Sequence, residues 1–266
     1  MIGAGLIVVK LGGTTIAGQE HVLDQVTELS SARPVIVVHG GGARVTEWLD
    51  RLGVPTRFED GLRVTDEAGL EVAAAVLRGA ANVELVAALR ARGCDAVGLS
   101  GVDGGLLSGR RVPGKGLVAT IGEVRPEFVE MLLAAGHVPV VAPLALDEHG
   151  SVCNVNADDV AAGLARGLGA SRLVLLTDVD GIRGADGGRI PRIAADEAER
   201  LISSGVIGGG MIPKVRAALR GLAVPGASAV IADGSDRDVL RLALSDGDLG
   251  TRITGAGDAA AHQGAA

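Results

Sequence analysis

Lysine is scarce in this chain, and two of its positions suggest phosphate chemistry. There are only three lysines, Lys10, Lys115 and Lys214, and the other cationic side chains are arginines. A base-composition bias explains the scarcity in general, but lysine persists best where a planar guanidinium cannot replace a compact, mobile charge. Lys10 lies just before a glycine pair, and Lys214 follows a glycine cluster at 208–210. We therefore expect these two ammonium groups to meet at one anion-binding crevice.

Two strand-like stretches end on glycine turns. Residues 6–13 read L-I-V-V-K-L-G-G, and residues 35–42 read V-I-V-V-H-G-G-G. A continuous apolar run is typical of a parallel strand that is buried on both faces. Where such strands end, main-chain N–H groups face a common crevice, and glycine lets an anionic oxygen approach them closely. A single glycine pair is equally well explained as a tight turn, but two such turns, one beside Lys10, favour a phosphate site.

Along the rest of the chain, apolar runs alternate with amphipathic stretches. This alternation predicts an α/β fold with a mainly parallel sheet and right-handed crossovers. The expected helices cover residues 19–31, 43–52, 65–91, 127–135, 156–168, 195–204, 213–222 and 237–244. The expected strands cover residues 6–11, 35–38, 96–100, 138–142, 173–176 and 229–232, with an edge strand at 250–254.

Three segments depart from this alternation. Residues 53–63 contain Pro and Gly and are expected to form a hairpin or flap, and residues 101–124 are expected to form β-hairpins. Within the latter, G-R-R-V-P-G-K-G resembles a Walker phosphate loop, but it lacks the Ser or Thr that would hold Mg²⁺. We therefore interpret Lys115 as a hairpin residue. Thr65 is predicted to cap the long helix at 65–91, which suits a core helix and a subunit interface equally well.

Two further polar clusters follow predicted strands. Asn154 and Asp158 lie in the segment N-V-N-A-D-D, where capping of a helix by Asn156 would by itself explain the polar residues. Asp178 and Asp180 lie in the turn T-D-V-D-G, where carboxylates can shape the turn, bind a metal ion or accept hydrogen bonds from a nucleotide. The residue types alone leave these alternatives open.

Composition limits the function classes. The chain has 266 residues, a formal net charge of −7 and a pI near 5.3, and 1% of its residues are aromatic. General nucleic-acid binding needs a basic face, and stacking of bases needs aromatic side chains, so this class is excluded. Any positive charge for an anionic ligand must therefore be placed locally.

Other general features of the sequence suggest a cytoplasmic protein. Cys94 and Cys153 lack the spacing of a disulfide framework or a metal site, so we expect them to pack in the core. No apolar run reaches membrane-spanning length without charge or repeated glycine, and the N-terminus lacks a signal-peptide pattern, so a cytoplasmic location is expected. The length allows one large domain or two lobes, and the Gly/Ala-rich tail at 255–266 is expected to be mobile.

Six motifs spread over nearly the whole chain resemble the amino acid kinase family. They read V-V-K-L-G-G, V-H-G-G-G, D-G-L-R-V-T, N-V-N-A-D, L-T-D-V-D-G-I and G-M-I-P-K-V. K-L-G-G is shared by many members, whereas D-G-L-R-V-T together with N-V-N-A-D resembles the members that phosphorylate N-acetyl-L-glutamate. The resemblance implies an open αβα sandwich over residues 1–254. Its N-terminal lobe, about 1–170, would bind the acyl amino acid and form a homodimer, and its C-terminal lobe, about 171–254, would bind ATP.

The implied reaction transfers the γ-phosphoryl group of ATP to the γ-carboxylate of N-acetyl-L-glutamate. The product would be N-acetyl-L-glutamyl 5-phosphate, in arginine biosynthesis. A carboxylate with a reference pKa of about 4.3 is already ionised at neutral pH, so no general base is required. The difficulty is to bring one anion against another, which needs positioning and positive charge. By the resemblance, Lys10 and Lys214 stabilise the transferred group from two sides, and Asp158 orients both lysines.

The resemblance also assigns binding residues. Arg63 and Asn154 match ligands of the substrate α-carboxylate, which a guanidinium can hold through two parallel hydrogen bonds. Gly41 and Gly42 match the glycine turn at the substrate. The implied ATP-binding residues are Gly12, Gly13, Asp178, Val179, Asp180, Gly181, Ile182, Arg183, Val206, Ile207 and Gly208. Mg²⁺ would arrive on ATP, held mainly by the phosphates, so no protein ligand for a metal is expected.

The sequence departs from the family pattern in two places, and these departures define the alternative functions and assemblies. The first strand begins at about residue 6, which leaves no room for the N-terminal helix through which arginine-inhibited hexameric relatives assemble. An arginine-insensitive dimer is therefore expected. Residues 97–111 also resemble kinases for carrier-protein-linked aminoadipate or glutamate in lysine or arginine biosynthesis, although those relatives lack the full pair of substrate motifs. A non-catalytic nucleotide-binding sensor is the alternative from another class, but it could dispense with Lys10, Lys214 or Asp158.

Overall fold

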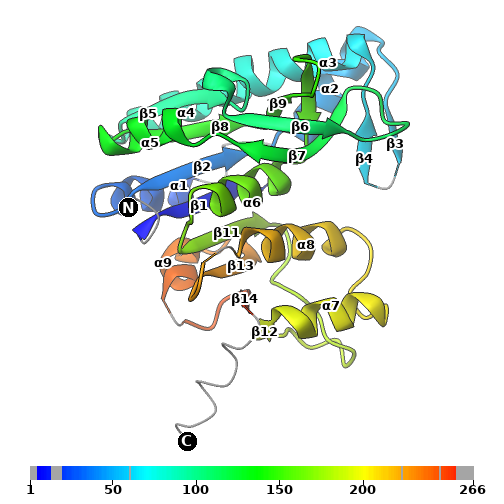
Figure 1. Cartoon of the computed structure of the whole chain (residues 1–266). Coiled ribbons are helices and arrows are strands. Elements are labelled where there is room, and N and C mark those ends of the chain that lie inside the picture. The colour runs from blue at the N-terminus through cyan, green and yellow to red at the C-terminus, as the bar shows by residue number, and fades with distance from the viewer. Residues whose placement is uncertain (1–4, 13–19, 60, 223, 246, 256–266) are drawn as a thin grey trace, which may run out of the picture.

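The apolar runs of the sequence form the inner strands of one large sheet. The computed structural model describes residues 5–12, 20–59, 61–222, 224–245 and 247–255. The sheet has eight strands in the order β12-β14-β13-β11-β1-β2-β8-β5 (Figure 1). Neighbours are parallel except for β13 and β14, which confirms the predicted α/β fold. The strands are β1 (Ile7–Leu11), β2 (Val35–His39), β5 (Ala96–Ser100), β8 (Val138–Ala142), β11 (Arg172–Thr177), β12 (Arg192–Ala194), β13 (Ser228–Asp233) and β14 (Thr251–Thr254).

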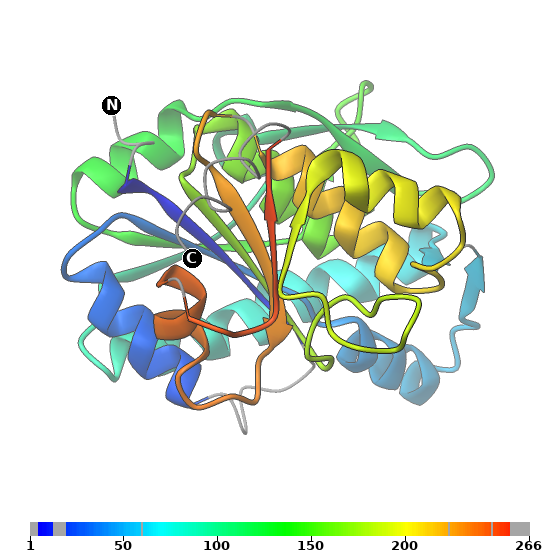
Figure 2. The same ribbon diagram turned by 90° about the horizontal axis from the view of Figure 1, so that it is seen from below.

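Helices cover both faces of this sheet (Figure 2). In β1, Val8 packs against the helices on one face, whereas Ile7 and Val9 pack against those on the other. This alternation is expected of a strand buried on both faces, because successive side chains point in opposite directions. The first face carries α5 (Glu127–Ala134), α6 (Ala157–Gly167), α7 (Ala195–Ser203) and α8 (Met211–Gly221), and the second carries α1 (Glu20–Ser30), α4 (Asn82–Arg90) and α9 (Val239–Leu244).

Two smaller β-structures lie beside the sheet. The predicted flap is an antiparallel hairpin of β3 (Arg57–Glu59) and β4 (Leu62–Val64). The predicted hairpin region contributes β6 (Leu107–Arg111) and β7 (Val118–Val124), which close into a small barrel with β9 (Leu144–Leu146) and β10 (Val152–Val155). Lys115 lies in the turn between β6 and β7, where its Nζ donates to Glu59 Oε2 at 2.8 Å. The sequence prediction that Lys115 belongs to a hairpin rather than to a Walker loop is confirmed.

The long helix predicted at 65–91 is continuous from α3 (Glu67–Ala74) through a π-helical turn (Ala75–Ala81) into α4. Its cap is Asp66, whose side chain accepts from Gly69 N, so the prediction of Thr65 as the cap is wrong. Thr65 instead bridges to Gly116 of the barrel turn. By length and composition alone, Glu67–Arg90 is apolar enough to cross a membrane, and 39% of its apolar window is buried within the protein.

Two other predictions need correction. The strand expected at the sheet edge, β14, lies between β13 and β12, because the three-residue strand β12 covers it. The sequence pattern did not predict β12, because this strand contains no apolar run. Pro213 was expected at the first helical position, but α8 begins at Met211. Proline is tolerated there because the first N–H groups of a helix have no intrahelical acceptor. Of the predicted tail at 255–266, residues 256–266 lie outside the described residues.

Candidate active site

Three charged side chains that were predicted to act together are in contact. Lys10 lies near the end of β1, Asp158 in the first turn of α6 and Lys214 in the first turn of α8. Lys214 Nζ donates to Asp158 Oδ2 at 3.0 Å, and Lys10 Nζ forms an ion pair with Asp158 Oδ1 at 2.9 Å. The side chains of Lys10 and Asp158 are 9% and 7% exposed, and that of Lys214 is 23% exposed. One carboxylate therefore holds two ammonium groups side by side, facing a common space.

Local structure explains the position of Asp158. Asn156 caps α6, since its side-chain oxygen accepts from Asp158 N at 2.8 Å. The predicted capping role of Asn156 is thereby confirmed. A carboxylate in the first helical turn is also favoured by the helix dipole. The capping and catalytic interpretations of this segment are compatible, because Asn156 supplies the cap and Asp158 is left to bind the lysines.

Burial and neighbouring charges shift the pKa values in this cluster. Burial lowers the pKa of Lys10, and the Lys214 ammonium lowers it further, against the opposing effect of Asp158. Burial alone would raise the pKa of Asp158, but Lys10 and Lys214 outweigh it and the pKa of this carboxyl is lowered. Asp158 is therefore ionised at neutral pH. With two cations and one anion, the cluster keeps a net positive charge for an incoming anion.

A small pocket beside the cluster contains all four residues predicted to bind substrate. It has a volume of about 180 Å³ and is lined by Gly41, Gly42, Arg63 and Asn154. Ala157, next to Asp158, lines the same pocket, which places it against the charged cluster. Apolar walls come from Val45, Phe58, Leu62, Leu77 and Val118. The pocket combines polar groups for a carboxylate with apolar surface for a short carbon chain.

Arg63 is held firmly in this pocket. It is 7% exposed, and its Nη2 donates to Gly42 O and to Thr46 Oγ1, both at 2.8 Å. Its guanidinium lies 4.6 Å from the centre of the Phe58 ring. Burial lowers the pKa of Arg63, and Asp50 partly opposes this shift. Sequence analysis did not identify Thr46 and Phe58 as neighbours of Arg63, although Thr46 follows Gly42 by one helical turn.

A larger pocket contains the predicted nucleotide-binding residues of the C-terminal half. Its volume is about 560 Å³, and 178–183 and 206–208 all line it. Met211 and Asp233 line it too, and sequence analysis missed both. The available signal for Asp233 was its place at the end of the apolar run of β13, directly beside Thr177 of β11. Met211 belongs to the same helical turn as Lys214, so this pocket also adjoins the charged cluster.

The first glycine turn is only partly described. Gly12 is buried, and a Cβ there would lie 2.1 Å from Leu176 O, so close approach of β1 to β11 requires glycine. Gly12 lines neither of the two pockets described above. Gly13 lies outside the described residues. A contact of these glycines with a nucleotide therefore stays a prediction.

Comparison with known proteins shows the family. Residues 5–233 match the profile of the Amino acid kinase family. The chain belongs to this family. It is 48% identical over 247 residues to acetylglutamate kinase of Rubrobacter xylanophilus, covering 93% of this chain and 96% of that one. It is 41% identical over 261 residues to the chloroplastic acetylglutamate kinase of Arabidopsis thaliana, covering 94% and 75% of the two chains.

Solved structures agree on the fold. Smu.665 from Streptococcus mutans superposes with a TM-score of 0.79 at 25% identity, covering 94% of this chain and 98% of that one. N-acetylglutamate synthase from Neisseria gonorrhoeae superposes with a TM-score of 0.82 at 22% identity, covering 95% of this chain and 60% of that one. The open αβα sandwich expected for an amino acid kinase is thereby confirmed.

This amino acid kinase also has a buried polar chain behind its glycine turn. His39 Nδ1 donates to Gly40 O at 2.7 Å, and Asn82 Nδ2 donates to His39 Nε2 at 3.0 Å. Because a carbonyl can only accept, Nδ1 carries the proton. Asn82 also donates to Val140 O and accepts from Arg78. The imidazole thus links the turn at 40–42 to the long helix, a contact that sequence analysis did not foresee.

A pH dependence of stability follows from His39. Burial lowers its pKa, Gly40 O opposes, and Arg78 lowers it further. Below a pH of about 6.5, His39 is protonated in the unfolded state but stays neutral in the folded state. The free energy of unfolding therefore falls as the pH decreases, by up to about 1.4 kcal/mol per pH unit. Urea unfolding between pH 7.5 and 5 should show a shallower decline of the free energy of unfolding in His39→Asn than in the wild type. The asparagine amide can still donate a hydrogen bond in place of the N–H at Nδ1. Equal declines in the two proteins would contradict this account.

Proposed function

We propose that this kinase transfers the γ-phosphoryl group of ATP to the γ-carboxylate of N-acetyl-L-glutamate. The product is N-acetyl-L-glutamyl 5-phosphate, as needed for arginine biosynthesis. The observation that carries the proposal is the Lys10–Asp158–Lys214 cluster, whose neighbour Ala157 lines a small pocket with a buried arginine and whose neighbour Met211 lines a larger pocket with nucleotide-binding motifs. The two named acetylglutamate kinases at 48% and 41% identity support the same acceptor.

The small pocket fits this acceptor chemically. Arg63 and Asn154 offer donors for the α-carboxylate, while the apolar walls suit the methyl and methylene groups. The γ-carboxylate then points toward Lys10 and Lys214. Since this carboxylate is ionised at neutral pH, it attacks phosphorus without a base, and the enzyme has only to position it and screen its charge.

ATP is assigned to the larger pocket. Its adenosine end would lie among residues 178–183 and 206–208, with the phosphates directed at the two lysines. The described residues contain no group of three or more His, Cys, Asp or Glu that could hold a metal ion. We therefore propose that Mg²⁺ comes with the nucleotide, where it neutralises phosphate charge. Asp178 and Asp180 then serve the nucleotide or the turn rather than a protein metal site.

The transferred group bears negative charge on three oxygens in the transition state. Lys10 and Lys214 approach it from β1 and α8, and Asp158 keeps both ammonium groups fixed before substrate arrives. Such fixed charges act without reorganisation at the moment of reaction. The main-chain N–H groups of Gly41 and Gly42 add donors at the acceptor.

Trapping of the acyl phosphate tests the reaction directly. Purified protein with Mg-ATP and hydroxylamine should form hydroxamate with N-acetyl-L-glutamate, and not with aspartate, free glutamate or N-acetyl-aminoadipate. Formation of hydroxamate from another acceptor would support the kinase activity but identify a different substrate. If no acceptor gives hydroxamate although the protein binds ATP, the result would favour a non-catalytic nucleotide-binding sensor or a kinase for a carrier-linked substrate.

Replacement of Arg63 by lysine should mainly affect substrate binding. Lysine keeps the positive charge but loses the paired donors and the stacking on Phe58. Together these losses should weaken binding by about 1–2 kcal/mol. We expect KM for N-acetyl-L-glutamate to rise about tenfold while KM for ATP stays constant. An unchanged KM for N-acetyl-L-glutamate would show that Arg63 does not bind this substrate.

We further propose a homodimer that works in the cytoplasm. The long helix Glu67–Arg90 supports a subunit interface, because more than half of its apolar window is not buried within the chain and Val83 is 58% exposed. Light scattering should give the dimer mass, and Val83→Glu should shift it toward monomer. Two buried free thiols, Cys94 and Cys153, suit a reducing compartment.

A further inference from the structure

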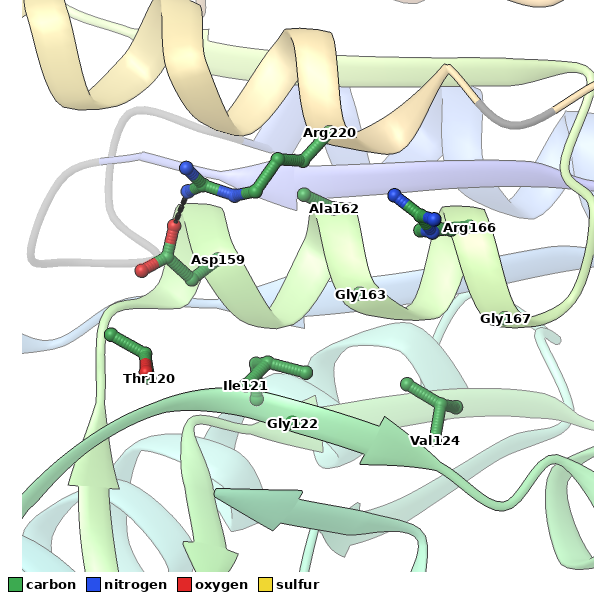
Figure 3. A pocket seen from close by; sticks show the side chains of 10 residues that line it. All are labelled: Thr120, Ile121, Gly122, Val124, Asp159, Ala162, Gly163, Arg166, Gly167 and Arg220. Atoms are coloured by element: carbon green, nitrogen blue, oxygen red, sulfur yellow. Dashed lines mark hydrogen bonds and ion pairs between the residues drawn. The ribbon is translucent and has the colours of Figure 1, made fainter. Parts of the chain in front are cut away.

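A third pocket lies on the outer side of α6, away from the residues assigned to substrate and nucleotide. It has a volume of about 550 Å³, with α6 at its back and β7 and α8 at its sides (Figure 3). Its lining residues include Thr120, Ile121, Val124, Asp159, Ala162, Arg166 and Arg220. None of them belongs to the Lys10–Asp158–Lys214 cluster, so the proposed reaction does not explain this pocket.

Three charged groups line this pocket, namely Asp159 and the exposed Arg166 on α6 and Arg220 on α8. Arg220 of α8 holds Asp159 Oδ1 of α6 by an ion pair. Burial raises the pKa of Asp159, and Arg220 opposes that shift. Within the described part of the chain, Asp159 Oδ2 and the Arg166 guanidinium have no hydrogen-bond partner. The pocket therefore offers one free carboxylate oxygen and two guanidinium groups, with a net charge of +1.

The spacing of these groups defines the length of an occupant. Asp159 and Arg166 are seven residues apart on α6, or roughly 10 Å along the helix axis. The side chains of Arg166 and Arg220 both lie on the side of α6 that faces α8, with Ala162 between them (Figure 3). A ligand that contacts both ends must therefore carry polar groups at its two ends and a short carbon chain in the middle.

The surface between the charged ends is apolar and closely packed. Ala162 and Gly163 form it on α6, and Ile121 and Val124 border it on β7. A Cβ on Gly163 would lie 2.9 Å from Ile121 Cγ2, and one on Gly167 would lie 2.8 Å from Val124. The two glycines allow β7 to lie close to α6. The Ile121 and Val124 side chains therefore form an apolar wall against α6 between the charged ends of the pocket.

We propose that this pocket binds a free acidic α-amino acid of the size of glutamate. The α-carboxylate pairs with Arg220, the α-ammonium with the free oxygen of Asp159, and the side-chain carboxylate with Arg166. A ligand with two methylenes between its charged ends and a hydrogen bond of about 2.9 Å at each end has a length comparable to the roughly 10 Å between the helix positions of Asp159 and Arg166. The net charge of −1 on such a ligand neutralises the pocket. A simple dicarboxylate would leave Asp159 facing an anion, and a neutral amino acid would leave Arg166 unpaired.

The position of the pocket gives such binding a direct route to the catalytic cluster. Asp159 follows Asp158 in the same turn of α6, and Arg220 belongs to the helix that carries Lys214. The two helices are thus joined by Lys214–Asp158 on one side and Arg220–Asp159 on the other. An occupant that binds Arg220 and Asp159 acts on the helix pair that positions both catalytic charges.

Calorimetric titration of the full chain tests the proposal without any turnover. L-glutamate should bind with one site per chain, whereas L-glutamine and glutarate should each bind about tenfold more weakly, because each lacks one charged contact. In Arg166→Ala, the affinity for L-glutamate should fall to that for L-glutamine, and L-glutamine itself should bind as before. Arg216→Ala, an exposed arginine of α8 outside the pocket, is the matched control and should change nothing.

Three outcomes would overturn the proposal. Loss of L-glutamate binding in Arg63→Ala, with retention in Arg166→Ala, would place the amino acid in the substrate pocket. Inorganic phosphate that competes with L-glutamate and binds as tightly would indicate a general oxyanion site. Absence of saturable binding up to millimolar L-glutamate would leave the pocket without this function. Each outcome is independent of whether the protein phosphorylates N-acetyl-L-glutamate.

Discussion

Lys214→Ala and Lys10→Ala should each lower kcat by about 10²–10³, with a much smaller effect on ATP binding. Each lysine supplies a preorganised charge to a group that gains its full negative charge distribution only in the transition state. The effect should therefore appear in kcat rather than in KM. Steady-state kinetics of the two variants, with ATP affinity measured separately, gives both quantities.

The chain offers a matched control for this experiment. Arg216 is an exposed cation on the same helix as Lys214, two residues further along. Arg216→Ala should retain full turnover, which separates loss of the catalytic charge from a change in overall charge. Near-normal kcat in either lysine variant, in protein that melts like the wild type, would refute the assigned role.

Asp158→Asn should lower kcat by a similar or larger factor and change its pH dependence. The carboxylate raises the pKa of Lys10 against burial and against Lys214, so its removal lowers this pKa further. Lys10 then loses its proton at lower pH. If the protonated form is the active one, the alkaline limb of the kcat profile moves to lower pH in the variant.

The pH profile separates orientation from simple stabilisation of the fold. Asn keeps the shape of Asp and leaves the Asn156 cap intact, but it leaves two ammonium groups without their counter-charge, so the loss of stability should be about 3 kcal/mol. In Lys10→Ala/Asp158→Asn, the additional loss should be smaller than the sum of the two single effects, because both variants disturb one unit. An unshifted alkaline limb together with additive losses would indicate that Asp158 does not act through Lys10.

The contact between Lys10, Asp158 and Lys214 was partly predictable because the sequence signals of the two lysines are local and chemically unusual. Lys10 follows an apolar strand and precedes glycine, and Lys214 opens a helix after a glycine cluster. Parallel strands bring such ends to one edge of the sheet. Asp158 follows the cap Asn156, so its position in a first helical turn was also readable. The convergence of the two lysines needed only the fold class and their sequence positions, whereas the role of Asp158 was implied only by the resemblance to the amino acid kinase family.

Other contacts could not be predicted, because they depend on packing between distant segments. Thr46 and Phe58 hold Arg63 from α2 (Gly42–Leu52) and from the flap, and neither residue type is unusual in its place. Asn82 meets His39 only because the long helix lies against β8. Likewise, the pocket at Arg166 arises between β7, α6 and α8, and no motif marks it. The alternation of apolar and polar residues records which face is buried, but not which partner covers it.

The π-helical turn at Ala75–Ala81 has a consequence for how this enzyme can evolve. A π-helical turn holds one more residue than an α-helical turn, so the loss of one residue from it would leave a regular α-helix without rotating the helix on either side. Elsewhere in the helix, an insertion or deletion would rotate everything beyond it by about 100°. Leu77, inside the turn, lines the acceptor pocket, whereas Asn82 lies just after it. Loss of one codon here is therefore expected to reshape the small pocket while His39 keeps its partner.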